Sequence, residues 1–171
     1  MYNELIYGWF REVKHTWDPN GVFNRGKITD TPPFDSYFRH IPGVETQQIE
    51  TIMDFSDSLG VMRAIERCNG SGDCRKGAPM GGTMCPSYMA TKEEKHSTRA
   101  RANILREYLL RSDKKNPFDH KEIYEVMDTC LSCKGCKSEC PSNLDMAKLK
   151  TEFLHHYYKS HIIPLRTRAI A

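Results

Sequence analysis

Four cysteines lie within eleven residues, in the spacing Cys130-x2-Cys133-x2-Cys136-x3-Cys140, and Pro141 follows the last of them. Thiolates are the soft ligands that bind iron in iron–sulfur clusters, and this spacing with its closing proline is a known cluster-binding run. In such a run the first three cysteines bind one [4Fe–4S] cluster and the fourth binds a second cluster. The run therefore predicts another cysteine group elsewhere, and it indicates electron transfer.

The chain supplies that second group as Cys68-x5-Cys74-x10-Cys85, again followed by a proline. If the ligands cross over between the groups, one cluster has four cysteines (Cys85, Cys130, Cys133, Cys136) and the other has three (Cys68, Cys74, Cys140). The alternative partition gives Cys68, Cys74, Cys85 and Cys140 to one cluster. Seven cysteines cannot fill two all-cysteine cubes, so we expect one [4Fe–4S] cluster beside a second cluster, [4Fe–4S] or [3Fe–4S].

A second cube would need a non-cysteine ligand or an iron open to solvent. Asp73 and His96 are the candidate oxygen and nitrogen ligands, although each also has an ordinary interpretation as a loop residue and as a residue before a helix cap. An open iron could do Lewis-acid chemistry on a substrate, but the sequence offers no proton-transfer pair beside it. The chain by itself is therefore not expected to be catalytic.

The main alternative is a structural zinc site or a protein-interaction module without a redox role. Structural zinc usually takes two ligand pairs separated by a longer loop, which four cysteines ending in Cys-Pro fit poorly. Residues 92–115 are rich in Lys and Arg and are best explained as a solvated helix face. A second interpretation places Arg99 or Arg101 near a cluster, where positive charge would raise its reduction potential.

Composition argues against nucleic-acid-binding, membrane-spanning and secreted proteins. The chain has 171 residues, 39% hydrophobic and 27% charged, with a formal net charge of +3, which gives little support to nucleic-acid binding. No apolar run approaches the roughly 18 residues of a transmembrane helix, and the first residues do not form a secretory signal. The odd cysteine count argues against a closed disulfide framework, so we expect a cytoplasmic protein, with peripheral association at the inner membrane face as an option.

These cysteines need helices to position them, and the hydrophobic pattern predicts a mainly α fold. Residues 2–17 form an amphipathic helix whose apolar face we expect to fill a core, with part of it docking on something outside the chain, and a turn at Asp18-Pro19-Asn20-Gly21 ends it. Further helices are predicted over 47–59 (capped by Thr46 and Gly60), from Ser97 to before Asn116-Pro117, from Asp119 to about Asp128, and from Ser142-x-x-Asp145 to Pro164. No strand is expected after residue 30. The glycine-rich loop 69–84 can aim backbone N–H groups at a cluster.

Two segments carry a family resemblance. Residues 17–28, Trp-Asp-Pro-Asn-Gly-Val-Phe-Asn-Arg-Gly-Lys-Ile, resemble the last motif of the C-terminal domain of flavin-linked oxidases, an aspartate–proline turn followed by N-P-G-K, with Arg25 in place of the usual proline. The stretch from Cys68 to Asn103 is similar to the iron–sulfur region appended to that domain in large bacterial fused enzymes. The family includes D-lactate dehydrogenases, glycolate oxidase and D-2-hydroxyglutarate dehydrogenases.

The resemblance implies a C-terminal fragment with three parts. Residues 1–29 would be the tail of the oxidase domain, 30–45 a linker rich in proline and aromatics, and 46–171 an α-helical ferredoxin-like domain. FAD would bind in the missing N-terminal region of the same polypeptide, with Asn24 and Lys27 as its neighbours, unless these two residues serve only turn formation and surface charge. Electrons from a flavin that oxidises a 2-hydroxy acid would pass through the clusters to a quinone or to an iron–sulfur or cysteine-rich protein.

Overall fold

The computed structural model describes residues 3–38 and 48–170, and all regular structure within these ranges is helical. The chain divides into two units, Met1–Glu45 and Thr46–Ala171. The prediction of a mainly α fold is therefore confirmed. The call of Thr46 as a helix cap, together with linker residues 39–45, lies outside the described residues.

The first unit is built on helix α1, Glu4–Trp17, as predicted. The side chain of Asn3 caps it by accepting a hydrogen bond from the amide of Ile6 at 2.9 Å. After the helix, the carboxylate of Asp18 accepts from the amides of Val22 and Phe23, both at 2.8 Å, which folds the predicted turn. This local capping explains how a short segment holds its shape with little core of its own.

The apolar face of α1 does not fill a core within the described unit, so that expectation was wrong. Leu5, Trp9 and Val13 are exposed by 62, 55 and 59% of their surface. The reason is that the residues after the helix contact its polar side: the Asp30 amide donates to the Tyr7 hydroxyl at 2.8 Å, and Arg11 pairs with the Asp30 carboxylate.

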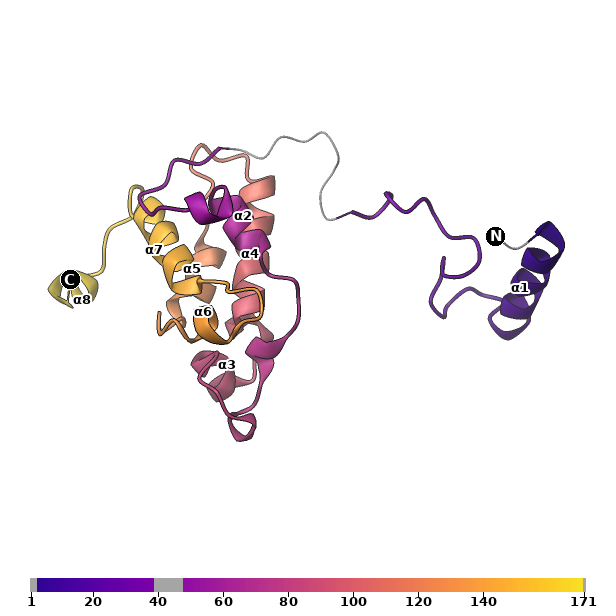
Figure 1. Ribbon diagram of the computed structural model, residues 1–171. Coiled ribbons are helices and arrows are strands. Elements are labelled where there is room, and N and C mark those ends of the chain that lie inside the picture. The colour runs from indigo at the N-terminus through magenta and orange to yellow at the C-terminus, as the bar shows by residue number, and fades with distance from the viewer. Residues whose placement is uncertain (1–2, 39–47, 171) are drawn as a thin grey trace. The chain divides into compact units, whose positions relative to one another are not determined.

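The second unit is a bundle whose longest helix, α4 (Thr98–Arg111), packs against α2 (Val61–Glu66), α5 (Lys121–Asp128) and α7 (Met146–Tyr157) (Figure 1). Apolar positions at helical spacing meet between these helices, among them the almost fully buried Ile65, Leu105, Ile123, Met127 and Phe153, and Phe118 from the turn before α5 adds to this core. Short helices α3 (Pro86–Thr91) and α6 (Gly135–Glu139) and 3-10 turns η1 (Ser56–Ser58), η2 (Asp73–Arg75), η3 (Ala78–Met80) and η4 (Glu94–His96) join them. The last helix is α8, Leu165–Ile170.

Helix α4 begins as the sequence predicts. Ser97 is its N-cap and accepts from the amide of Ala100 at 3.1 Å. The helix ends at Arg111, before Asn116-Pro117, where proline could not continue the hydrogen-bond ladder. The predicted start of this element, which carries Arg99 and Arg101, is confirmed.

The helix predicted over 47–59 is wrong. Residues 48–55 are extended or irregular, and only η1 and then α2 are helical in this region. The amides of Ile52 and Met53 donate to the buried carboxylate of Glu152, at 3.1 and 3.0 Å, instead of to a helix of their own. Gly60 begins α2 at φ 111° instead of ending a preceding helix.

Two predicted helix ends also differ from the structure. His120, not Asp119, occupies the N-cap of α5, because the Asp119 carboxylate instead pairs with His161 at 2.6 Å. Asp145, not Ser142, caps α7, which ends at Tyr157, well before Pro164. In the first case a tertiary partner, His161, takes the predicted cap residue. In the second case a carboxylate nearer to the helix, that of Asp145, provides the cap.

Candidate metal centres

The predicted run of cysteines lies between two helices. Cys130 lies two residues after the end of α5, and its amide donates to the Met127 carbonyl at 3.0 Å. A turn with Ser132 at φ 53° and Lys134 at φ 60° then leads into α6, which buries Cys136. The run therefore presents its cysteines around one point, from a helix end, a turn and a helix start.

A small cavity lies at that point, and a cysteine from a distant part of the chain also lines it. The cysteines around the cavity, named here the Cys136 group, are Cys85, Cys130, Cys133 and Cys136. Arg101 from α4 lines the same cavity. The structure thus brings together the four cysteines of the complete set in the predicted crossover.

Cys85 precedes α3 and is only 7% exposed. Burial alone would raise the pKa of the Cys85 thiol, but hydrogen bonds from Ser87 and the Tyr88 amide and the charge of Arg101 outweigh burial and lower that pKa. Since the thiolate is the metal-binding form of cysteine, this environment favours a ligand.

The guanidinium of Arg101 reaches Cys85 directly, with 3.3 Å between Nη1 and Sγ. The side chain is fully buried. Its other donors bond to the Val126 carbonyl at 2.8 Å, to Ser87 Oγ at 3.0 Å and to Thr129 Oγ1 at 2.7 Å. Of the two arginines that the sequence singled out, Arg101 is the one whose side chain contacts a cysteine sulfur.

The remaining buried cysteine, Cys74, lies in the 3-10 turn η2 within the glycine-rich loop. The pKa of its thiol is raised by burial and, to a smaller extent, by the neighbouring charges of Cys68 and Cys85, although the amide of Arg99 acts against this. That amide lies 3.4 Å from Cys74 Sγ. We name Cys68 and Cys74 the Cys74 group, and Cys85 of the Cys136 group lies near it.

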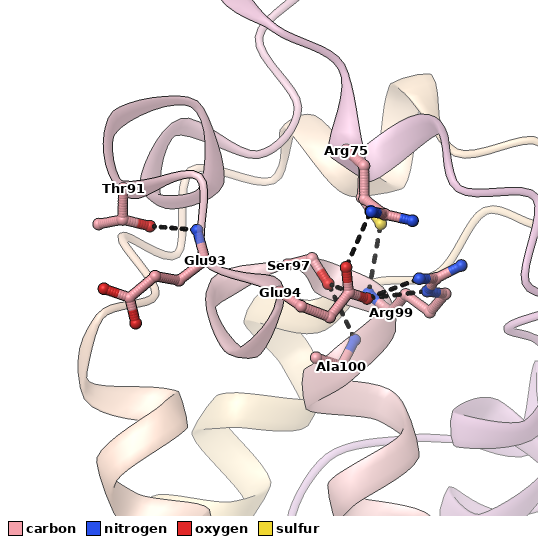
Figure 2. Close-up of polar contacts among 8 residues, drawn as sticks. Arg75, Thr91, Glu93, Glu94, Ser97, Arg99 and Ala100 are labelled. Atoms are coloured by element: carbon pink, nitrogen blue, oxygen red, sulfur yellow. Dashed lines mark hydrogen bonds and ion pairs between the residues drawn. The ribbon is translucent and has the colours of Figure 1, made fainter.

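Figure 2 shows how the start of α4 is held beside this loop. The carboxylate of Glu94 pairs with Arg75 at 2.8 Å on one side and with Arg99 at 2.8 Å on the other. The Arg99 guanidinium is thereby occupied by a carboxylate, and only its backbone amide faces Cys74. One residue thus positions a donor without bringing its charge to the sulfur.

Mutual repulsion within the Cys136 group provides a test of whether these residues fit a cluster. Burial is the main cause that raises the pKa of Cys136, and the nearby charges of Cys130, Asp145 and Cys133 raise it further. Iron shared among the thiolates would offset this repulsion, so the donor set fits an iron–sulfur cluster. Within residues 3–38 and 48–170, no three His, Cys, Asp or Glu side chains converge closely enough to hold one metal ion.

The loop that carries Cys85 is attached to the run at 130–140 by contacts that sequence reasoning missed. The Glu139 carboxylate accepts from the Thr83 amide and hydroxyl, both at 2.6 Å, and from the Met84 amide at 3.1 Å. A Cβ at Gly135 would lie 2.9 Å from Thr83 Oγ1, so only glycine allows this approach. The only local signal was a carboxylate directly before Cys140, which no periodicity singles out.

Another missed residue is Lys150 of α7. Its ammonium donates to the Cys130 carbonyl at 2.6 Å, and burial is the main cause that lowers its pKa. Lys150 therefore fixes the backbone of a cysteine in the run. Its place on a helix that is otherwise read as a core element gave no hint of this.

The other predicted site residues have structural partners of their own. Asp73 pairs with Lys76 at 3.3 Å, and His96 is buried with Nδ1 2.8 Å from Thr91 Oγ1. Cys140 follows α6 and packs against the core. His96 meets a cysteine through its backbone, because Cys85 Sγ donates to the His96 carbonyl at 3.3 Å, while the imidazole bonds to Thr91.

In the first unit, Asn24 and Lys27 are exposed, and Asn24 has φ 48°. Lys27 lines an open cavity with other basic residues, namely Arg11, Lys14, His15 and Arg25. Asn24 lies in the irregular segment that follows helix α1. A role for either residue at FAD remains a prediction.

Comparison with known proteins agrees with this geometry. Residues 67–145, which include all seven cysteines, match the family described as a 4Fe-4S dicluster domain. The chain contains an iron–sulfur electron-transfer module. The sequence-based prediction of an α-helical iron–sulfur domain is thus confirmed, and the ligand assignment stays a prediction.

Relatives extend the similarity over the whole chain. It is 26% identical to the D-2-hydroxyglutarate dehydrogenase of Escherichia coli K12 over 100% of this chain and 20% of that protein. The enzymes of the same name from Pseudomonas putida and Pantoea ananatis are 26 and 27% identical, over 94 and 100% of this chain and 19 and 20% of theirs. The chain therefore spans about a fifth of the length of these relatives. No solved structure matches.

Membrane attachment was part of the localisation prediction. Within the described residues, no helix has the length and apolar character needed to cross a bilayer.

Proposed function

We propose that this chain is the iron–sulfur electron-transfer module of an FAD-linked 2-hydroxy-acid dehydrogenase. The observation that carries the proposal is the cavity lined by Cys85 together with Cys130, Cys133 and Cys136, within a segment that matches a dicluster domain. The cysteines come from two distant stretches of sequence, as the crossover of a two-cluster domain requires.

The proposal assigns ligands to two clusters. The Cys136 group would bind one [4Fe–4S] cluster, and Cys68, Cys74 and Cys140 would bind a second cluster, [4Fe–4S] or [3Fe–4S]. When bound, such clusters accept and release single electrons. The residues of the chain bury the sites, donate hydrogen bonds to the sulfurs and hold the two cysteine segments together, and these are the factors by which a protein sets reduction potentials.

The rest of the enzyme would lie outside this chain. Relatives named D-2-hydroxyglutarate dehydrogenase support a 2-hydroxy acid as the substrate class and an FAD-binding domain on the same polypeptide, with Asn24 and Lys27 as candidate neighbours of the flavin. A quinone or an iron–sulfur or cysteine-rich protein would take the electrons, in the cytoplasm or at the inner membrane face. The chain alone would lack dehydrogenase activity.

The test is the iron and acid-labile sulfide content of the anaerobically reconstituted chain, with EPR spectra before and after dithionite. About seven or eight irons per chain with cluster signals would support two clusters, and about seven would indicate a three-iron centre. About one zinc without sulfide would contradict the proposal and support a structural metal module instead.

A further inference from the structure

Arg101 is a buried cation in an unusual setting. Its hydrogen-bond partners within the described part of the chain are the Val126 carbonyl, two hydroxyl groups and the sulfur of Cys85, and none of them is a carboxylate. A buried charge without a counter-charge is strongly unfavourable. The only acidic group among these partners is the thiol of Cys85, which points to negative charge at the Cys136 group as the missing counter-charge.

We propose that Arg101 raises the reduction potential of the cluster held by the Cys136 group, so that this cluster accepts an electron more readily than it would without the buried guanidinium. The inference rests on the proposed function, because it needs that cluster. The reasoning is electrostatic: reduction adds one negative charge to a site already surrounded by thiolates. A fixed positive charge and an N–H donor on a ligand sulfur stabilise that reduced form.

Cys74 differs from Cys85 in the donor that contacts its sulfur. Cys74 Sγ receives a backbone amide at 3.4 Å, while the guanidinium of the same residue, Arg99, pairs with Glu94. That ion pair is partly exposed, so solvent screens what charge remains. At the Cys136 group the guanidinium is fully buried and 3.3 Å from the sulfur, where screening is weak.

The experiment is an EPR-monitored redox titration of the reconstituted full chain, comparing the natural sequence with Arg101→Gln. We expect one of the two potentials to fall by about 59 mV, which corresponds to a tenfold change in a one-electron equilibrium, while the other stays unchanged. Potentials that are unaltered, or that both shift equally, would overturn the inference. A potential is the suitable readout because a purely structural role would not shift one cluster selectively.

Arg106→Gln is the matched control. Arg106 lies on the same helix and is largely buried, but its guanidinium bonds to Asn103 at 3.3 Å and to Glu107 at 2.9 Å. Its removal should leave both potentials unchanged. A fall of the same potential in this variant would show that loss of any cation from α4 is enough, and would contradict the specific role of Arg101.

Two further variants keep the test decisive if Arg101→Gln fails to fold. Arg101→Lys keeps the charge and should lower the same reduction potential by less than Arg101→Gln does. Thr129→Val removes one acceptor that orients the guanidinium while leaving it in place, and it should also lower that potential by a smaller amount. Unchanged potentials in both would overturn the inference. Absence of cluster signals in the natural chain would instead contradict the proposed function, so the two failures are distinguishable.

Discussion

The two cysteine groups use the same ligand type in opposite surroundings. The Cys136 group faces a cavity between helices, beside the buried guanidinium of Arg101. Cys74 lies in a loop of 3-10 turns and glycines, where the nearby cations pair with Glu94 near the surface. The difference teaches that spacing selects the ligands, while the charges and dipoles that the fold brings to each sulfur distinguish the two sites.

Removing one cysteine from each group in turn should have the largest effect, because each variant should lose a different cluster. Cys136→Ala is expected to lose one cluster, about four irons, while Cys74→Ala should leave that cluster in place and lose the other. Iron, sulfide and EPR measurements on both variants check this. If either substitution removed all iron, the two groups would not be separate sites.

Gly135→Ala should separate the two cysteine segments. The added Cβ would lie 2.9 Å from Thr83 Oγ1, so the Thr83 side chain, which donates to Glu139 and ties the loop before Cys85 to the run, must shift. We expect a loss of about 1–3 kcal/mol in the free energy of unfolding and poor occupancy at the Cys136 group. Urea unfolding and iron content measure both quantities.

Gly77→Ala is the control for that substitution. An added Cβ there would meet its nearest neighbours at 3.5 and 3.7 Å, which are ordinary contacts, and the residue lies in the same loop region. Its stability and iron content should match those of the natural chain. Equal losses in both variants would mean that any extra carbon in the loop is harmful.

Glu152→Gln should lower stability without distinguishing the groups. The fully buried carboxylate accepts from the amides of Ile52 and Met53, and an amide side chain can keep only one of these bonds. Loss of a hydrogen bond to a charged group costs about 2 kcal/mol. Unfolding experiments should show this loss, whereas the two reduction potentials should not change. A selective shift of one potential would link this region to a cluster.

The smallest effect concerns pH. Hydrogen bonds from Thr83 and Met84 lower the pKa of Glu139 below its ordinary value of 4.5. Because the folded-state pKa is depressed, the stabilisation is present above pH 4.5 and is lost as the pH falls from there through the folded-state pKa. The free energy of unfolding of the cluster-free chain should therefore fall less below pH 4.5 in Glu139→Gln than in the natural chain. Identical pH profiles would rule out this contribution.

Local patterns predicted the helices that carry their own signals. Ser97 caps α4, and apolar residues at helical spacing mark α1, α5 and α7. The helix predicted over 47–59 failed because the buried carboxylate of Glu152, about a hundred residues away in sequence, takes the amides of Ile52 and Met53. Local helix propensity does not decide the structure where a distant side chain offers the backbone amides a better hydrogen-bond acceptor.

The sequence by itself determined that this chain binds iron–sulfur clusters, because thiolate chemistry and the spacing of four cysteines before a proline are local properties. It left two ligand partitions open, and one of them joins Cys85 to the run at 130–140. Only the tertiary structure decided which charge reaches which sulfur: Arg99 and Arg101 are two residues apart, yet one pairs with Glu94 and the other contacts Cys85. The two arginines differ because their side chains leave the helix in different directions and meet different neighbours. The spacing of residues in the sequence does not reveal those neighbours.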